Sequence, residues 1–250
     1  MPIDLTKFER GDSAGGAEPG ALADRLAHLQ LAQIVHRRRA IILFEGWDAC
    51  GKRSAVRRLA GAWDPCAFAT HCLSAPDQDR HWLATYWSCL PGAGASSLFH
   101  GSWYRYVADE RLAGLLADKA WLRRCDEINE FEAQQRDHGT LIVKLFFHVT
   151  AEVQARRIAK RDADPWRRWL APSGDRRGQP TRELRQATWT DLLSHTDTRW
   201  APWTLIDANG QDAGAEAALG AIIGAFEKNI PLDPPAEADK VVPIGQQKAG

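Results

Sequence analysis

Residues 40–52, AIILFEGWDACGK, decide the fold. The stretch 40–45 is a short, largely apolar run with β-branched and aromatic side chains, which is typical of a strand buried on both faces of a parallel sheet. A glycine-containing stretch, 46–52, follows directly, and residues 54–63 have the pattern of a helix. This order of strand, glycine loop and helix, closed by Lys52, predicts a phosphate-binding loop. The plain alternative is a tight strand-to-helix turn with a solvated lysine.

The chemistry of the loop follows from its residue types. Glycines let successive backbone N–H groups turn inward, the helix start adds positive potential, and Lys52 supplies a point charge between phosphates. Arg53 stands where a serine or threonine hydroxyl would bind magnesium in a standard nucleotide-binding loop. Asp48 either bridges a cation to phosphate or caps the following helix, and both readings stay open here. The remaining predicted phosphate-binding residues are Gly46, Trp47, Ala49, Cys50 and Gly51.

Outside the loop, strand-like and helix-like segments alternate as in βαβ units, which predicts a three-layer α/β fold with a P-loop-like parallel sheet and helices on both faces. Further strands are expected at 96–99, 140–147 and 203–206. Helices are expected at 21–39, 54–63, 77–90, 104–135, 151–162, 181–195 and 214–228.

Composition places the chain among ordinary globular proteins. Its 250 residues are 44% hydrophobic and 26% charged, and 32 basic residues balance 32 acidic ones, so a polyanion has to be held by a local site. Five cysteines without a CxxC pair argue against disulfides and zinc, and indicate a cytoplasmic protein. We find no signal peptide and no membrane-spanning run. The expected organisation is a flexible arm at 1–20, one domain at 21–230 with a lid at about 160–190, and a disordered tail at 231–250.

Once the loop is in view, other short motifs fall into a familiar order. FEGWDACGK is followed by SAP at 74–76, a tryptophan-rich stretch ending at 90–91, SWY at 102–104, EINEFE at 127–132, KLFFH at 144–148, DPWRRW at 164–169 and APW at 201–203. In this order the chain resembles the family-2 polyphosphate kinases over roughly residues 20–228. The ordered set is far more specific than any single motif.

The resemblance implies a thymidylate-kinase-like P-loop core with a helical lid. It implies phosphoryl transfer between inorganic polyphosphate and a nucleoside mono- or diphosphate, with Mg2+ as cofactor. By this resemblance Lys52 would bind the phosphates, and Asp48 would coordinate the metal ion. The residues assigned to a nucleotide or polyphosphate lid are Ser102, Trp103, Tyr104, Arg105, Glu130, Arg167 and Arg168. The same resemblance favours a cytoplasmic homo-oligomer with no nucleic-acid or membrane partner.

The departures from the family pattern concentrate at charged positions. His100 and Gly101 stand where the family has an aspartate–arginine pair, so the second metal-binding carboxylate is missing. Other charged positions have changed at Thr85, Leu170, Gly210 and Gln211. Two interpretations follow: a phosphotransferase with reduced activity, or a catalytically degenerate paralogue that binds polyphosphate or nucleotide, or partners an active subunit. A monophosphate kinase using ATP is weaker because Arg53 removes the metal-binding hydroxyl.

Three further patterns allow two readings each. Cys50 lies near a helix start, where a thiol pKa is lowered, but a small packed residue is the plainer reading. Arginine-rich stretches between 156 and 177, with tryptophans between the arginines, fit a nucleic-acid surface, but polyphosphate attracts the same surface. The tryptophans of the second half are expected to pack rather than to stack on a base, namely Trp166, Trp169, Trp189, Trp200 and Trp203.

Overall fold

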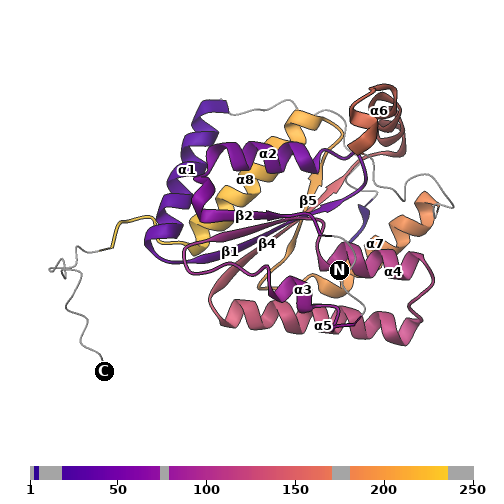
Figure 1. Ribbon diagram of the computed structural model, residues 1–250, viewed down its shortest axis with the longest axis horizontal. Helices are drawn as coiled ribbons and strands as arrows, with labels where there is room; N and C mark the ends of the chain where they lie inside the picture. The colour runs from indigo at the N-terminus through magenta and orange to yellow at the C-terminus, as the bar shows by residue number, and fades with distance from the viewer. Residues whose placement is uncertain (1–2, 6–18, 74–78, 171–180, 236–250) are drawn as a thin grey trace.

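The computed structural model describes residues 3–5, 19–73, 79–170 and 181–235, and its centre is a parallel sheet (Figure 1). Five strands lie in the order β2-β3-β1-β4-β5, and every neighbouring pair is parallel. Their bounds are β1 Arg39–Gly46, β2 Phe68–His71, β3 Ser96–His100, β4 Thr140–His148 and β5 Trp203–Asp207. β1 is central and buried along nearly its whole length, as its apolar sequence requires.

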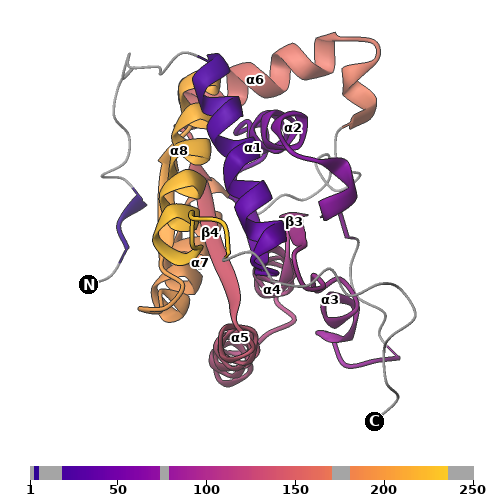
Figure 2. The same cartoon turned by 90° about the vertical axis from the view of Figure 1, so that its left-hand side faces the viewer.

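Helices cover both faces of the sheet. On one face α1 (Pro19–Val35), α2 (Lys52–Ala62) and α8 (Gln211–Asn229) pack on one another, and on the other face α4 (Trp103–Leu112), α5 (Asp118–Asp137) and α7 (Arg182–Thr196) do the same. α6 (Ala151–Ala163) lies beyond the carboxyl ends of the strands, as Figure 1 shows and Figure 2 confirms from the side. The short elements are α3 (Ala84–Trp87), η2 (Pro65–Ala67) and η3 (Arg167–Leu170). The predicted α/β class is confirmed.

The sequence prediction differs from the structure in four places. The helix expected at 21–39 ends earlier, at Val35, and Arg39 already belongs to β1. β2 was missed, because its sequence FATH is short and only half-buried at the edge of the sheet. The helix expected at 77–90 is wrong, since within that stretch only α3 is helical among the described residues. The helix expected at 104–135 is two helices, because the chain turns between α4 and α5 at Gly114, which has a φ of 73°.

The predicted arm, lid and tail lie partly outside the described residues, which exclude 6–18, 171–180 and 236–250. Residues 3–5 of the arm are packed on the domain: Leu5 is 1% exposed, and the Ile3 amide donates to Ser194 Oγ at 3.2 Å. At the start of the tail, the Asp233 carbonyl lies 2.8 Å from His36 Nε2. In the part of the chain that the structure describes, no helix is both long enough and apolar enough to cross a membrane.

Candidate phosphate-binding site

The loop between β1 and α2 is shaped by backbone that most residues avoid. Gly46 has a φ of 129°, and a Cβ there would overlap the Phe147 carbonyl of β4, so only glycine fits. Gly51 has a φ of 99°, and Ala49 adopts the left-handed region at 55° although it carries a side chain. The Trp47 amide donates to the Phe147 oxygen at 3.3 Å. The loop is therefore held against β4 and turns sharply into α2.

Lys52 is the first residue of α2 and is only 5% exposed. Its Nζ donates to the Gly46 carbonyl at 2.5 Å, so the ammonium is folded over the loop. An ammonium has three N–H donors, and this bond leaves it capacity for a bound phosphate. The structure thus places the positive charge of Lys52 at the loop, as the predicted glycine–lysine site requires.

A half-open cavity of about 340 Å³ lies over the loop and collects most of the predicted residues. Of the loop, Trp47, Asp48, Ala49, Cys50, Gly51, Lys52 and Arg53 line it. Its cationic side chains are Lys52, Arg53, Arg105, Arg157, Lys160, Arg161 and Arg167. Among the described residues that line this cavity, Asp48 is the one carboxylate. We call this cavity the cationic cup.

Asp48 is neutralised by an arginine from another element. Arg105 of α4 places Nη1 3.2 Å from Asp48 Oδ1, and its Nε lies 3.4 Å from Asp109 Oδ2 on the same helix. Burial opposes ionisation of Asp48, but the charges of Arg105 and Lys52 outweigh it and lower the pKa of the carboxyl. The helix-cap reading of Asp48 is wrong, because the N-cap of α2 is Gly51 and no side chain caps it.

His100, the last residue of β3, also lines the cup. Burial, and then the charges of Lys52 and Arg53, lower the pKa of His100 to about 4, so its imidazole is neutral at pH 7. A neutral imidazole is not a ligand that magnesium favours. Position 100 therefore brings neither a negative charge nor a hard oxygen ligand to the cup.

We tested whether these residues fit the magnesium ion expected from the sequence. The described residues contain no group of three or more His, Cys, Asp or Glu side chains placed to hold a metal ion. The one carboxylate of the cup is paired with Arg105, and Glu45, which lies behind the loop, is fully buried. The side chains present do not fit a magnesium ion held by the protein.

Glu45 joins the loop to α4 in a way that sequence reasoning did not find. Its Oε1 accepts from the Ser102 amide at 2.6 Å and from Ser102 Oγ at 2.7 Å, and Ser102 in turn caps α4 by accepting from the Tyr104 amide. Burial raises the pKa of Glu45, while Lys52 opposes the rise. Among the described residues, Glu45 Oε2 has no hydrogen-bond partner. The sequence signal for such a role was the position of Glu45, a carboxylate at the end of an otherwise apolar strand.

Side chains of α6 and of the first residue of α7 also contact the loop. Gln154 Nε2 donates to the Asp48 carbonyl at 3.1 Å, and Arg157 Nη1 donates to the Ala49 carbonyl at 3.3 Å. The guanidinium of Arg182 lies 4.1 Å from the ring centre of Trp47, whose Nε1 contacts His148 Nδ1 at 3.0 Å. Both faces of the loop are therefore fixed by side chains distant in sequence.

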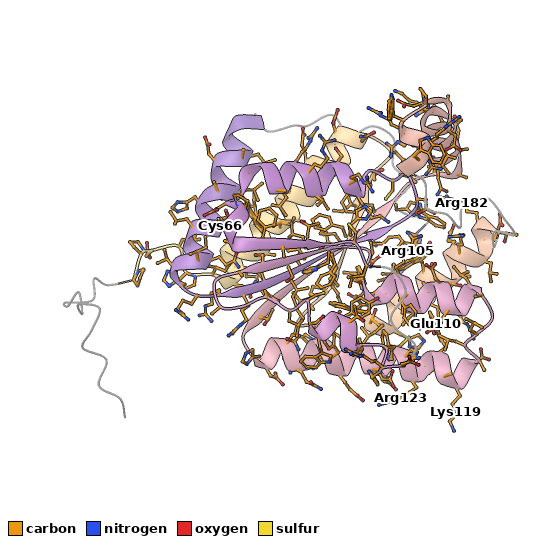
Figure 3. The ribbon with its side chains drawn as sticks, viewed as in Figure 1. Cys66, Arg105, Glu110, Lys119, Arg123 and Arg182 are labelled. Atoms are coloured by element: carbon orange, nitrogen blue, oxygen red, sulfur yellow. The ribbon has the colours of Figure 1, made fainter. Side chains whose placement is uncertain are left out.

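Several predicted lid residues lie away from the cup. Trp103 and Tyr104 are buried and both donate to Glu132 of α5, at 3.2 and 2.6 Å. Glu130, also on α5, is exposed and its Oε1 pairs with Arg123 Nη1 at 3.0 Å. Figure 3 shows Arg105 and Arg182 at the carboxyl end of the sheet and Arg123 well away on α5. Arg167 lines the cup, whereas Arg168 is exposed beside Trp169.

The remaining patterns are resolved by burial. Burial raises the pKa of the Cys50 thiol, which supports the packing reading. Packing is confirmed for Trp189 and Trp203 but is wrong for Trp166 and Trp169, which are 85% and 76% exposed. Trp200 is also exposed, at 41%, and its ring lies under the guanidinium of Arg136. Of the arginine-rich stretch expected to attract polyphosphate, Arg157, Arg161 and Arg167 line the cup, whereas sequence reasoning did not single out Lys160 or Gln211 as cup residues.

A parallel sheet with a glycine-rich loop between its central strand and the next helix, opening into a cationic cup, defines a P-loop phosphate-binding protein. Residues 11–229 match the family model described as Polyphosphate kinase 2 (PPK2). The chain therefore belongs to the polyphosphate kinase 2 family.

Individual relatives agree with this assignment. The chain is 35% identical over 197 residues to a polyphosphate:AMP phosphotransferase of Pseudomonas syringae pv. tomato, covering 77% of this chain and 39% of that protein. It is 31% identical over 206 residues to a polyphosphate:AMP phosphotransferase of Pseudomonas aeruginosa, covering 81% and 42%. This chain thus spans about two fifths of the length of these curated relatives.

A solved structure shows the same fold. The crystal structure of polyphosphate kinase 2 from Arthrobacter aurescens TC1 has a TM-score of 0.82 to this chain at 24% identity, covering 96% of this chain and 94% of that one. The sheet order and the position of the loop described above are therefore features of a known fold.

Proposed function

We propose that this chain is a polyphosphate-dependent phosphotransferase that moves a phosphoryl group between inorganic polyphosphate and a nucleoside phosphate, with the polyphosphate in the cationic cup. The observation that carries the proposal is the charge of the cup, where lysine and arginine side chains from α2, α4, α6 and η3 face one paired carboxylate. A chain of phosphates fits such a cavity, because charge-assisted hydrogen bonds from lysine and arginine to phosphate are stronger than those between neutral groups.

A second cavity supports a place for the acceptor. It measures about 310 Å³, shares Arg105 with the cup, and is otherwise lined by Leu73, Tyr86, Tyr106, Asp109, Glu110 and Leu115. Aromatic rings and carboxylates suit a nucleobase, which stacks on the former and donates to the latter. Arg105 then stands between the acceptor and the polyphosphate.

The residues of the cup do what phosphoryl transfer asks of a protein. The reaction breaks a terminal phosphoanhydride bond while an oxygen of the acceptor phosphate bonds to the transferred phosphorus, and it depends on alignment and charge neutralisation. Lys52 and the loop amides would hold the polyphosphate, and Arg167 on η3 would cover it from the far side. Any magnesium would arrive with the phosphates, since the side chains of the cup do not fit it.

The test is an assay of transfer from long-chain polyphosphate to AMP, GMP, ADP and GDP, run beside calorimetric titration of the same polyphosphate. Lys52→Ala should weaken binding by about tenfold to a hundredfold, because one hydrogen-bonded charge is lost. Lys119→Ala is the matched control, since Lys119 is exposed on α5, away from the cup (Figure 3). Equal affinity of wild type and Lys52→Ala would contradict the proposal.

The second candidate is a polyphosphate-binding domain with little turnover of its own. The pairing of Arg105 with Asp48 and the neutral His100 favour it, because the cup then offers no free carboxylate to position a metal at the transferring phosphoryl group. Tight binding without turnover for any of the four acceptors would select this candidate. Turnover comparable to that of a family member with every motif in place would exclude it.

A further inference from the structure

The cationic cup already holds a positive charge where a metal ion would be expected. Asp48 lies inside the loop, and the group beside its Oδ1 is the guanidinium of Arg105 at 3.2 Å. The Asp48 side chain is 17% exposed and that of Arg105 is 33% exposed. The pair is therefore part of the wall of the cup.

The position of Arg105 is set by the fold. Ser102 caps α4 and is held by the buried Glu45, so the helix start is fixed to the end of β1. Asp109 holds Arg105 Nε from one turn further along. Gly101, just before the cap, has a φ of 82°, a backbone conformation that favours glycine, and a Cβ there would lie 3.6 Å from Arg105 Cδ, in ordinary contact.

We propose that Arg105 replaces a divalent cation in this cup, so that the site binds metal-free polyphosphate. The inference rests on the proposed function, because it assumes that polyphosphate occupies the cup. A guanidinium has five N–H donors, and the contacts to Asp48 and Asp109 engage two of its nitrogens, so Nη2 is placed to donate to a phosphate oxygen. Asp48 orients the guanidinium and is neutralised by it.

The charge of the cup then predicts whether magnesium strengthens or weakens the binding of polyphosphate. With Asp48 neutralised, the cup attracts the phosphate chain without help from a metal. Magnesium bound along polyphosphate reduces the charge of the chain, and so weakens its attraction to the arginines and lysines of the cup. Magnesium should therefore weaken binding or leave it unchanged, whereas a metal-bridged site would require it.

The experiment is calorimetric titration with polyphosphate of defined length, in EDTA and in excess magnesium, at one ionic strength. We expect wild type to bind at least as tightly in EDTA. Arg105→Gln should lose about tenfold to a hundredfold in EDTA and regain part of this with magnesium, because Asp48 is then free. Arg123→Gln is the matched control, since Arg123 is an exposed arginine paired with a carboxylate on α5. Thermal melting checks that each variant is folded.

Asp48→Asn tests the same inference without removing the arginine. If Arg105 supplies the charge, this variant binds in EDTA as well as wild type or better, because it removes a negative charge from the cup. If Asp48 bridges a metal, the variant loses binding in magnesium. Wild-type binding that needs magnesium and is lost in Asp48→Asn would overturn the inference while leaving the proposed function intact. Failure of wild type to bind in either buffer would overturn the proposed function itself.

Discussion

Substitution of Lys144 by methionine tests the buried ion pair that joins the sheet to the helix layer of α4, α5 and α7. Lys144 of β4 and Glu132 of α5 are both fully buried, and Nζ lies 2.9 Å from Oε2. Nζ also donates to the Thr196 carbonyl at 2.7 Å and to the Tyr104 hydroxyl at 3.1 Å. Burial lowers the pKa of Lys144, and Glu132 opposes the shift. One ammonium thus joins β4, α4, α5 and α7.

The magnitude follows from what the substitution leaves behind. Methionine has a similar volume, so the cost comes chiefly from a carboxylate without its counter-ion and a carbonyl without its donor. Removing one partner of a buried ion pair costs about 3–5 kcal/mol. For a domain of this size about 1 kcal/mol shifts the melting temperature by about 2–4 °C. Lys144→Met should therefore melt about 6–20 °C below wild type.

The assay is thermal and urea unfolding followed by circular dichroism. The double variant Lys144→Met, Glu132→Gln should recover much of the loss, because no unpaired charge remains and Tyr104 and Trp103 can still donate to the amide oxygen. Arg123→Gln, which breaks an exposed pair, should change the midpoint little. Melting of Lys144→Met within about 1 °C of wild type would refute the reasoning, as would a double variant less stable than the single one.

Two further predictions concern stability at other positions. The pKa of His100 is about 4 in the fold against 6.5 ordinarily, so the unfolded chain takes up the proton first as the pH falls, and about 3 kcal/mol is lost between pH 6.5 and 4. His100→Asn should melt with a flatter pH dependence over that range, and an unchanged slope would contradict the assignment. Arg37, two residues beyond the last residue of α1, has a φ of 54°, and the Arg38 amide donates to the Gln33 carbonyl, as in a helix stop that favours glycine. Arg37→Gly should raise stability by up to about 1 kcal/mol by urea titration, and a lower midpoint would contradict this reading.

The strands and the loop could be predicted because their signal is local. Four strands appear at their expected places: β1 and β4 are mostly buried along their length, β3 and β5 carry apolar or aromatic side chains, and the loop follows the first of them directly. β2 is only four residues long and none of them is buried, so its sequence carries no such signal. In the stretch 77–90, Trp82 and Tyr86 bury their rings from turns and the short helix α3, so apolar spacing indicated more helix than the chain forms.

The candidate site could be predicted only as far as the loop itself. Residues 47–54 are contiguous and line one cavity, because a single turn of the chain between β1 and α2 brings them together, while the predicted Gly46 is not part of the lining. Arg105 reaches Asp48 from 57 residues further along, because β3 lies beside β1 and α4 begins just after β3. That contact depends on strand order, which sequence pattern leaves open. Similarly, Glu130 lies on the α5 face that points away from the sheet, whereas Glu132, two residues on, is buried.

The central position of β1 also sets when, during folding, the cup can exist. β1 has β3 on one side and β4 on the other, and Trp47 meets His148 across 101 residues of sequence. Gly46 packs closely against the Phe147 backbone, and the Trp47 amide donates to the Phe147 carbonyl. The loop therefore lacks these stabilising contacts until β4 has paired with β1. Contacts so distant in sequence form late and slowly, because the chain loses conformational entropy in closing a large loop before the contact can stabilise it. A nascent chain that has emerged only as far as α5 would carry every loop residue and still lack the cup.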